Sequence, residues 1–246
     1  MYGLIGYPLG HSFSAGYFKE KFERENINEQ YKAFPLKDIA EFKDLYEAMS
    51  DLKGVNVTIP YKRDVMKFLD FLSDDAEEIG AVNVVKINRN EEGFPVLKGY
   101  NSDWQGFSES LKPLLHDGIK GALVLGSGGA SKAVCYALRQ LNIKPLTISR
   151  KSAPGVMTYE DIDKDVINNN LLIVNTTPLG MYPNVGGCPD LPYHYLTSAH
   201  VCYDLVYNPE ITEFMKKSAA YGAIVKNGLE MLHRQAEISW EIWNSL

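Results

Sequence analysis

The chain has 246 residues, of which 45% are hydrophobic and 23% are charged, and its formal net charge at pH 7 is −6. This length and composition predict a globular protein with one large domain or two domains of ordinary size. The negative balance argues against nucleic acid or an anionic membrane as the main partner, because phosphate contacts need clustered lysine and arginine, but it leaves room for a local cationic pocket that takes a small anion.

The first hundred residues alternate between short apolar runs and stretches with apolar side chains at helical spacing. Strands are predicted at 2–6, 31–36 and 55–59. Helices are predicted around 13–22, over 38–49 with Asp38 as N-cap, and over 61–71. Two further strands, 81–87 and 95–100, flank a polar segment and are predicted to pair as a hairpin.

A second series follows a predicted helix at about 103–115 and a polar break at 116–121. The segment 122–126 is wholly apolar, as expected for a strand buried on both faces of a parallel sheet. Further strands are predicted at 145–149, 171–177 and 201–205, and helices after residue 129, near 159–167, near 211–221 and over 228–243. Two α/β domains is the fold class that this pattern favours.

The three cysteines, Cys135, Cys188 and Cys202, are far apart, and the chain has no CxxC pair and no HExxH. Neither a disulfide framework nor a metal site is indicated, and Cys135 and Cys202 are expected to be core thiols. No basic segment precedes an apolar one at the start, and no apolar run approaches a membrane span, so a cytoplasmic protein without a membrane partner is predicted.

The strongest local motif is VLGSGGASKAV at 124–134. An apolar strand ends at a glycine-rich turn, and an alanine-rich helix follows. Such a turn lets backbone N–H groups and a helix N-terminus meet a pyrophosphate. Gly126 and Gly128 occupy the first two places of the dinucleotide fingerprint and Ser131 the third, and Gly129 and Ala130 complete the predicted cofactor loop.

Two later segments bear on the cofactor. Ser149, Arg150 and Lys151 end the next predicted strand, where an NAD site usually carries a carboxylate, so the two cations favour NADP. A solvated basic turn is the alternative. The segment NTTPLGM at 175–181, with Thr176 and Pro178, leaves a strand at its carboxyl end and could lie along a nicotinamide ring or form a structural turn.

Nicotinamide chemistry needs a side chain that gives or takes the alcohol proton, and His, Tyr and Lys are the common choices. His11 lies in the opening turn GYPLGHSFSA, where Ser14 could cap a helix, and Lys62 follows a strand in GVNVTIPYKRD. Asn56 and Thr58 share a strand face, and Asn83 lies within an apolar strand. Several such polar groups indicate a polar substrate with many hydroxyls.

These segments together carry a family resemblance. The blocks occur in the order, and at about the spacing, of shikimate dehydrogenase, and the match runs almost from end to end. They are GYPLGHSFS, NVTIPYK, GAVNVV, NSDWQGF, LGSGGASKAV, SRK, NTTPLGM, YDLVYNP and NGLEMLHRQA.

The resemblance implies the reversible NADPH-dependent reduction of 3-dehydroshikimate to shikimate, a step of aromatic amino acid biosynthesis. It implies a substrate domain of residues 1–103 plus 228–246, a Rossmann-type NADP domain of residues 104–227 and a cleft between them. The partners expected are the small-molecule substrate and NADP, on a monomer or homodimer.

The resemblance also assigns roles to single residues. Lys62 matches the family's catalytic lysine and Asp103 its partner aspartate. Arg150 matches the arginine that reads the 2′-phosphate, and Gly228 is expected beside the cofactor. The implied substrate-binding residues are Ser12 and Ser14 for the carboxylate, Asn56, Thr58, Asn83, Asp103 and Gln235 for ring hydroxyls, and Tyr207 near the substrate.

The sequence departs from the family where Ala15 and Gly16 follow the second serine instead of proline, and where Ser149-Arg150-Lys151 replaces Asn-Arg-Thr. Three other readings stay open: a paralogue that oxidises quinate or uses NAD, a catalytically silent NADP-binding module, and a methylenetetrahydrofolate dehydrogenase-like enzyme. Arg150 and Lys151 weigh against NAD, although the substrate motifs hardly separate quinate from shikimate. The Lys62/Asp103 pair weighs against the silent module, and the serines of the opening turn weigh against the methylenetetrahydrofolate dehydrogenase-like enzyme.

Overall fold

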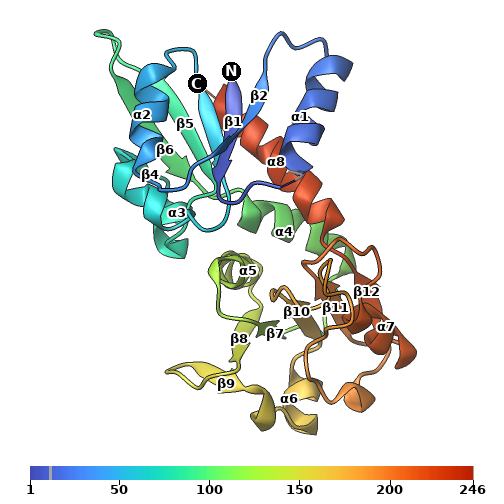
Figure 1. The fold of residues 1–246 in the computed structure, drawn as a ribbon. Helices are drawn as coiled ribbons and strands as arrows, with labels where there is room; N and C mark the ends of the chain where they lie inside the picture. Colours follow the sequence, from blue (N-terminus) through green and yellow to red (C-terminus); the bar gives the residue numbers. More distant parts are fainter. Residues whose placement is uncertain (11–12, 246) are drawn as a thin grey trace. The chain divides into compact units, whose positions relative to one another are not determined.

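The structure, a computed structural model, describes residues 1–10 and 13–245. The chain divides into two compact units, Met1–Ser102 with Gln235–Leu246, and Asp103–Arg234. Each unit has its own six-stranded sheet with helices on both faces (Figure 1). The predicted fold class of two α/β domains is confirmed.

The first unit is built on a sheet of order β2-β1-β3-β5-β6-β4. Its strands are β1 (Tyr2–Gly6), β2 (Tyr31–Pro35), β3 (Gly54–Val57), β4 (Phe71–Leu72), β5 (Val84–Arg89) and β6 (Pro95–Tyr100). Its helices are α1 (Phe13–Arg24), α2 (Glu41–Ala48), the 3₁₀ helix η1 (Asp64–Phe68), α3 (Asp74–Ile79) and the later part of α8 (Leu229–Asn244). β1 pairs in parallel with β2 and β3, and β5 pairs antiparallel with β3 and β6, which confirms the predicted hairpin.

The two faces of this sheet carry separate cores, because successive strand side chains point to opposite faces. On one face Tyr2 and Val84 pack against Phe18 of α1 and Trp243 of α8. On the other face lies a second cluster to which α2, η1 and α3 contribute Phe42, Tyr46, Val65 and Ala76.

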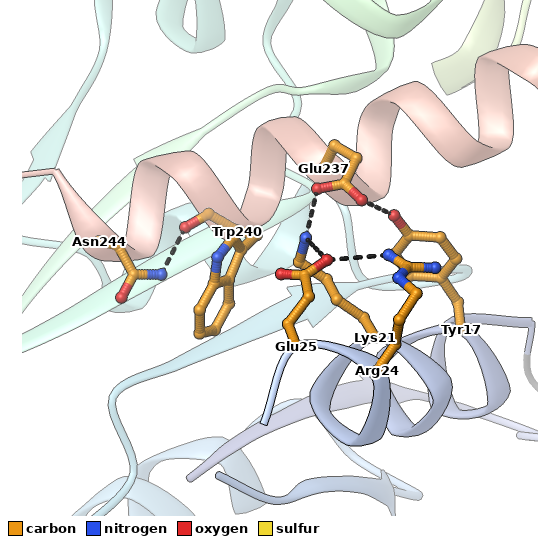
Figure 2. A network of polar contacts seen from close by, with 7 residues as sticks. All are labelled: Tyr17, Lys21, Arg24, Glu25, Glu237, Trp240 and Asn244. Carbon is orange, nitrogen blue, oxygen red and sulfur yellow. Dashed lines mark hydrogen bonds and ion pairs between the residues drawn. The ribbon is translucent and has the colours of Figure 1, made fainter. Parts of the chain in front are cut away.

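A polar network joins α1 to α8 above the first of these cores (Figure 2). Lys21, only 5% exposed, donates to Glu237 Oε2 at 2.8 Å and to Glu25 Oε1 at 3.1 Å, and the Tyr17 hydroxyl donates to Glu237 Oε1. Burial lowers the pKa of Lys21, but its hydrogen bonds to the two carboxylates outweigh burial, so that pKa is raised and the lysine stays charged. Glu237 therefore fixes the position of α8 on α1.

The second unit is built on a parallel sheet of order β12-β11-β10-β7-β8-β9. Numbered within the unit, this is the doubly wound order 3-2-1-4-5-6 read from the other edge. The strands are β7 (Gly121–Leu125), β8 (Lys144–Ser149), β9 (Val156–Thr158), β10 (Leu172–Asn175), β11 (Val201–Asp204) and β12 (Ile224–Lys226). The helices are α4 (Asp103–Leu111), η2 (Lys112–Leu114), α5 (Gly129–Gln140), η3 (Tyr159–Asp161), α6 (Lys164–Asn169), η4 (Tyr193–Tyr195) and α7 (Glu213–Ala220).

The central strands of this sheet are buried on both faces, as their unbroken apolar runs predict. Val124 packs in the cluster that includes α4 and α5, and its neighbour Leu123 packs in the cluster that includes α6 and α7. Cys202 is fully buried in the second cluster, as predicted, whereas Cys135 is only half-buried on α5.

The boundary between the units falls inside α8 and not at its start. Met231, in the first turn of α8, packs in the second unit's core, and Arg234 forms an ion pair with Glu109 at 3.9 Å. The helix therefore begins in one unit and ends in the other. Asp103 likewise opens the second unit as the first residue of α4.

Three predicted helices differ from the structure. The helix predicted near 159–167 is two elements, η3 and α6, because Ile162 between them is extended. Residues 61–71 do not form one helix: after a turn and η1, Phe71–Leu72 pairs with β6, and the Leu97 N–H donates to Asp70 Oδ2 at 2.8 Å. The helix predicted over 38–49 begins only at Glu41, with Ala40 as N-cap. Asp38 Oδ1 accepts from the Ala40 N–H at 2.9 Å, so this side chain forms a turn before the helix.

Candidate functional site

Lys62 lies in the turn that follows β3, held between two buried neighbours. The Tyr61 hydroxyl donates to the Leu36 carbonyl at 2.7 Å, and Val65 is fully buried in the core below. The Lys62 carbonyl accepts from the Val82 N–H at 2.7 Å. These hydrogen bonds and the burial of Val65 therefore hold the backbone of this turn in place, while the Lys62 side chain is half-buried.

The opening serine turn is described only in part. Ser12 and His11 lie outside the described residues. Ser14 is the second residue of α1, which starts at Phe13, so Ser14 does not serve as the N-cap of that helix. Thr58 follows β3, is half-buried, and donates its backbone N–H to the Ile5 carbonyl at 3.0 Å. Ser14 and Thr58 thus both belong to the first unit. Ser14 lies at the start of α1, which follows β1 in the chain, and Thr58 follows β3, which pairs with β1.

The two predicted amides, Asn56 and Asn83, lie together in one buried network. Asn56 Nδ2 donates to the Asn83 carbonyl at 3.3 Å and to Ser239 Oγ at 2.9 Å. Asn83 Nδ2 donates to Ser102 Oγ at 2.9 Å, and Asn83 Oδ1 accepts from the Ser102 N–H at 2.7 Å. Both amides are at most 5% exposed, so protein partners set the orientation of each.

Three members of this network were missed by the sequence analysis: Ser102, Ser239 and Tyr31. Ser239 Oγ donates to the Gln235 carbonyl at 2.7 Å and lies 3.2 Å from Ser102 Oγ. The Tyr31 hydroxyl donates to Asn56 Oδ1 at 2.8 Å. Only the i, i+4 spacing of Ser239 from Gln235 could have indicated one of them, because the other contacts join residues far apart in sequence.

Asp103, Gln235 and Tyr207 differ in burial. Asp103 is 9% exposed in the first turn of α4, where a carboxylate is favoured by the positive end of the helix dipole. Gln235 is 8% exposed on α8. Tyr207 is 39% exposed in the loop after β11, and the neighbouring Asn208 carbonyl accepts from the Tyr182 N–H at 3.0 Å, which ties that loop to the one after β10.

The glycine-rich turn lies at the switch point of the parallel sheet, between β7 and β10. Gly126 has φ +112°, a value that L side chains rarely adopt, and a Cβ there would lie 2.7 Å from Thr176 Oγ1. Thr176 Oγ1 donates to the Leu125 carbonyl at 2.6 Å. The structure therefore brings two predicted cofactor residues, Gly126 and Thr176, together where open α/β sheets bind ligands.

The start of α5 has the features of an anion site. Gly128 is the N-cap and supplies no side-chain cap, and a Cβ built on Gly128 or Gly129 would meet nothing within 4 Å. The first N–H groups of this twelve-residue helix are thus presented beside open space. Ala130 follows in the first turn, and Ser131 is buried, as close packing of the helix on the strand requires.

The loop after β10 is held by a buried carboxylate, Asp204 at the end of β11. Asp204 Oδ1 accepts from Asn175 Nδ2 at 2.9 Å and from the Val206 N–H at 3.0 Å, and Oδ2 accepts from the Thr212 hydroxyl at 2.6 Å. Asn175 Oδ1 in turn accepts from the Thr177 hydroxyl at 2.6 Å. Burial is the largest effect on Asp204 and raises its pKa to about 6.

The remaining predicted cofactor residues lie near strand ends of the same unit. Ser149 ends β8 and is half-buried, whereas Arg150, Lys151 and Pro178 are exposed. Packing by itself favours glycine at position 228, because a Cβ there would lie 2.2 Å from the Leu205 carbonyl oxygen.

Within residues 1–10 and 13–245, no three His, Cys, Asp or Glu side chains are grouped as a metal site would require. None of the helices described is both long and apolar enough to cross a membrane.

Comparisons with known proteins agree with this arrangement. A family model described as the shikimate dehydrogenase substrate binding domain matches residues 4–85. The chain is 39% identical over 267 residues to shikimate dehydrogenase (NADP(+)) of Caldanaerobacter subterraneus, covering 99% of this chain and 91% of that protein.

Two solved structures extend the likeness to the fold. Shikimate 5-dehydrogenase from Thermus thermophilus, in complex with NADP(H) and shikimate, superposes with a TM-score of 0.85 at 31% identity, covering 100% of this chain and 93% of that one. The enzyme from Listeria monocytogenes, in complex with shikimate and NAD, has a TM-score of 0.86 at 30% identity, covering 98% and 90%. The chain belongs to the shikimate dehydrogenase family.

Proposed function

We propose that this chain is an NADP-dependent shikimate dehydrogenase, which reversibly reduces 3-dehydroshikimate to shikimate, with Lys62 and Asp103 as its acid–base pair. The observation that carries the proposal is the match over 99% of the chain to a relative named for this activity and cofactor. Lys62 and Asp103 are both retained, so a catalytically silent NADP-binding module is disfavoured.

The second unit is assigned to NADP. The uncapped start of α5 and the open space at Gly128 and Gly129 fit a pyrophosphate, which needs backbone N–H donors and close approach. Arg150 is exposed after β8, where a guanidinium can pair with a 2′-phosphate through two parallel hydrogen bonds. The bound cofactor supplies the hydride for reduction and accepts it in the reverse direction.

The first unit is assigned to the substrate. Shikimate has one carboxylate and several hydroxyls, so a site of serine, threonine and amide groups offers it matched hydrogen bonds. Ser14 and Ser12 are assigned to the carboxylate, and Asn56, Thr58, Asn83 and Gln235 to ring hydroxyls. The buried network around Asn56 and Asn83 supports this, because amides whose orientation is fixed before binding lose less entropy when they bind.

Lys62 is assigned the proton transfer. As the carbonyl of 3-dehydroshikimate is reduced, its oxygen gains negative charge, and an ammonium group can donate a proton to it and stabilise it. In the reverse direction the amine takes the proton of the alcohol. Asp103 is assigned the orientation of the lysine, which a charge-assisted hydrogen bond from an ammonium group to a carboxylate provides.

The test is a comparison of shikimate and quinate as substrates, each with NADP and with NAD, in one preparation of purified protein. We expect the formation of reduced cofactor to be fastest with shikimate and NADP. The Lys62→Ala variant, purified in the same way, controls for dehydrogenase carried over from the expression host. Turnover only with quinate and NAD would contradict the proposal and favour the paralogous activity.

A further inference from the structure

Tyr31 belongs to the first unit, and the family resemblance assigns it no role. It is the first residue of β2, the edge strand, and its ring stacks on Phe18 of α1 with centroids 4.6 Å apart and planes 15° apart. The hydroxyl donates to Asn56 Oδ1 at 2.8 Å. Burial raises the pKa of Tyr31, so the phenol stays protonated and remains a donor.

This hydroxyl connects two elements that are not neighbours in the sheet. β2 and β3 lie on either side of β1, with Tyr31 opposite Tyr2 and Asn56 opposite Leu4 in register. The Tyr31 side chain therefore reaches across β1 to Asn56 on β3. The phenol oxygen thus contacts a residue assigned to a ring hydroxyl of the substrate.

The contacts of Asn56 show what the hydroxyl does. An amide has one oxygen with two lone pairs and one NH₂ group with two hydrogens. Asn56 Nδ2 already donates to Ser239 Oγ and to the Asn83 carbonyl, and the Tyr31 hydroxyl holds Asn56 Oδ1 on the opposite side. This arrangement gives the amide a single orientation, with one lone pair of the oxygen left for a ligand hydroxyl.

We propose that Tyr31 is a positioning residue of the substrate site: its hydroxyl holds the Asn56 amide in one orientation, so that the remaining lone pair of Asn56 Oδ1 receives a ring hydroxyl of the substrate. The inference rests on the proposed function, because Asn56 takes its role from it. Tyr31 touches neither the reacting carbon nor the cofactor in this assignment, so its loss acts on substrate affinity.

The test is Tyr31→Phe, which keeps the aromatic stacking and removes only the hydroxyl. We expect KM for shikimate to rise about tenfold, since the buried Asn56 oxygen loses its donor, with kcat and KM for NADP within about twofold of wild type.

A double-mutant cycle and a matched control separate positioning from plain destabilisation. In an Asn56→Ala background, Tyr31→Phe should cost clearly less than about tenfold, because the two groups act through one contact. Tyr193→Phe is the control: it removes a buried tyrosine hydroxyl that donates to the Pro189 carbonyl at 2.7 Å in the other unit. It should lower the melting temperature without changing KM for shikimate.

The outcomes are distinct. An unchanged KM for shikimate in Tyr31→Phe, with active wild-type protein, would overturn the inference and leave the proposed function standing. Additive losses in the cycle would also overturn it, because Tyr31 would then not act through Asn56. Wild-type protein that does not oxidise shikimate at all would refute the proposed function and the inference together.

Discussion

The buried carboxylate of Asp204 makes a sharp prediction about stability and pH. Its side chain is fully buried and accepts three hydrogen bonds, from Asn175, Val206 and Thr212. Burial nevertheless dominates, and the pKa rises from 3.8 to about 6. The folded protein therefore holds this proton more tightly than the unfolded chain does.

The sign and size of the effect follow from linkage. With the folded pKa raised above the unfolded value, the contribution of Asp204 to stability is fully present below about pH 4 and is lost as pH rises through about 6. Each pKa unit is worth about 1.4 kcal/mol, so a separation of about two units corresponds to about 3 kcal/mol. In Asp204→Asn this titration is absent. The free energy of unfolding of the variant minus that of wild type should become more favourable by about 3 kcal/mol between about pH 3 and pH 7.

Urea unfolding of both proteins across this pH range measures that difference. Using the difference matters, because other carboxylates titrate in both proteins and cancel. Asp161→Asn is a control of opposite sign: hydrogen bonds from Thr158 lower the pKa of Asp161, so its contribution is present at neutral pH and lost as pH falls. A difference between Asp204→Asn and wild type that stays constant with pH would refute the reasoning.

Three further predictions concern activity and packing. Lys62→Ala should lower kcat by about 10²- to 10⁴-fold with little change in KM, measured by steady-state kinetics, and a defect mainly in KM would make Lys62 a binding residue. Arg150→Ala should raise KM for NADP by roughly ten- to a hundredfold and leave KM for NAD nearly unchanged; equal losses with both cofactors would contradict its assignment to the 2′-phosphate. Gly228→Ala should lower stability by about 1–3 kcal/mol in thermal unfolding, because the new Cβ would lie 2.2 Å from the Leu205 carbonyl oxygen, and an unchanged melting temperature would show that this backbone can shift.

Periodicity predicted the elements whose signal is local. The apolar runs at β7, β10 and β11 and the spacing of Phe18 and Phe22 on α1 were enough to place strands and helices. The prediction of one helix over 61–71 was wrong because the apolar residues of this segment pack around a turn and pair with β6. Helical spacing does not reveal that contact. The prediction of Asp38 as an N-cap was wrong because turn formation and helix capping use the same side-chain oxygen, so the residue type does not tell them apart.

The same distinction between local and distant signals holds for the residues of the candidate site. The glycine turn between β7 and α5 could be predicted from sequence, because the pattern of a phosphate loop lies in consecutive residues. The resemblance assigned roles to Lys62 and to the residues proposed to bind the substrate, one by one. The contacts of Asn56 with Tyr31 and Ser239 could not be predicted, because they join positions up to 183 residues apart in the chain.

The sequence alone thus determined the family, the two α/β units, the glycine loop and the cationic end of β8, all of which are written in local patterns of residue type. Only the tertiary structure decided that α8 begins in one unit and ends in the other, that Asp204 is buried with a raised pKa, and that Tyr31 reaches Asn56 across β1. Burial and hydrogen-bond partners depend on which distant segments pack together, and no local pattern records them.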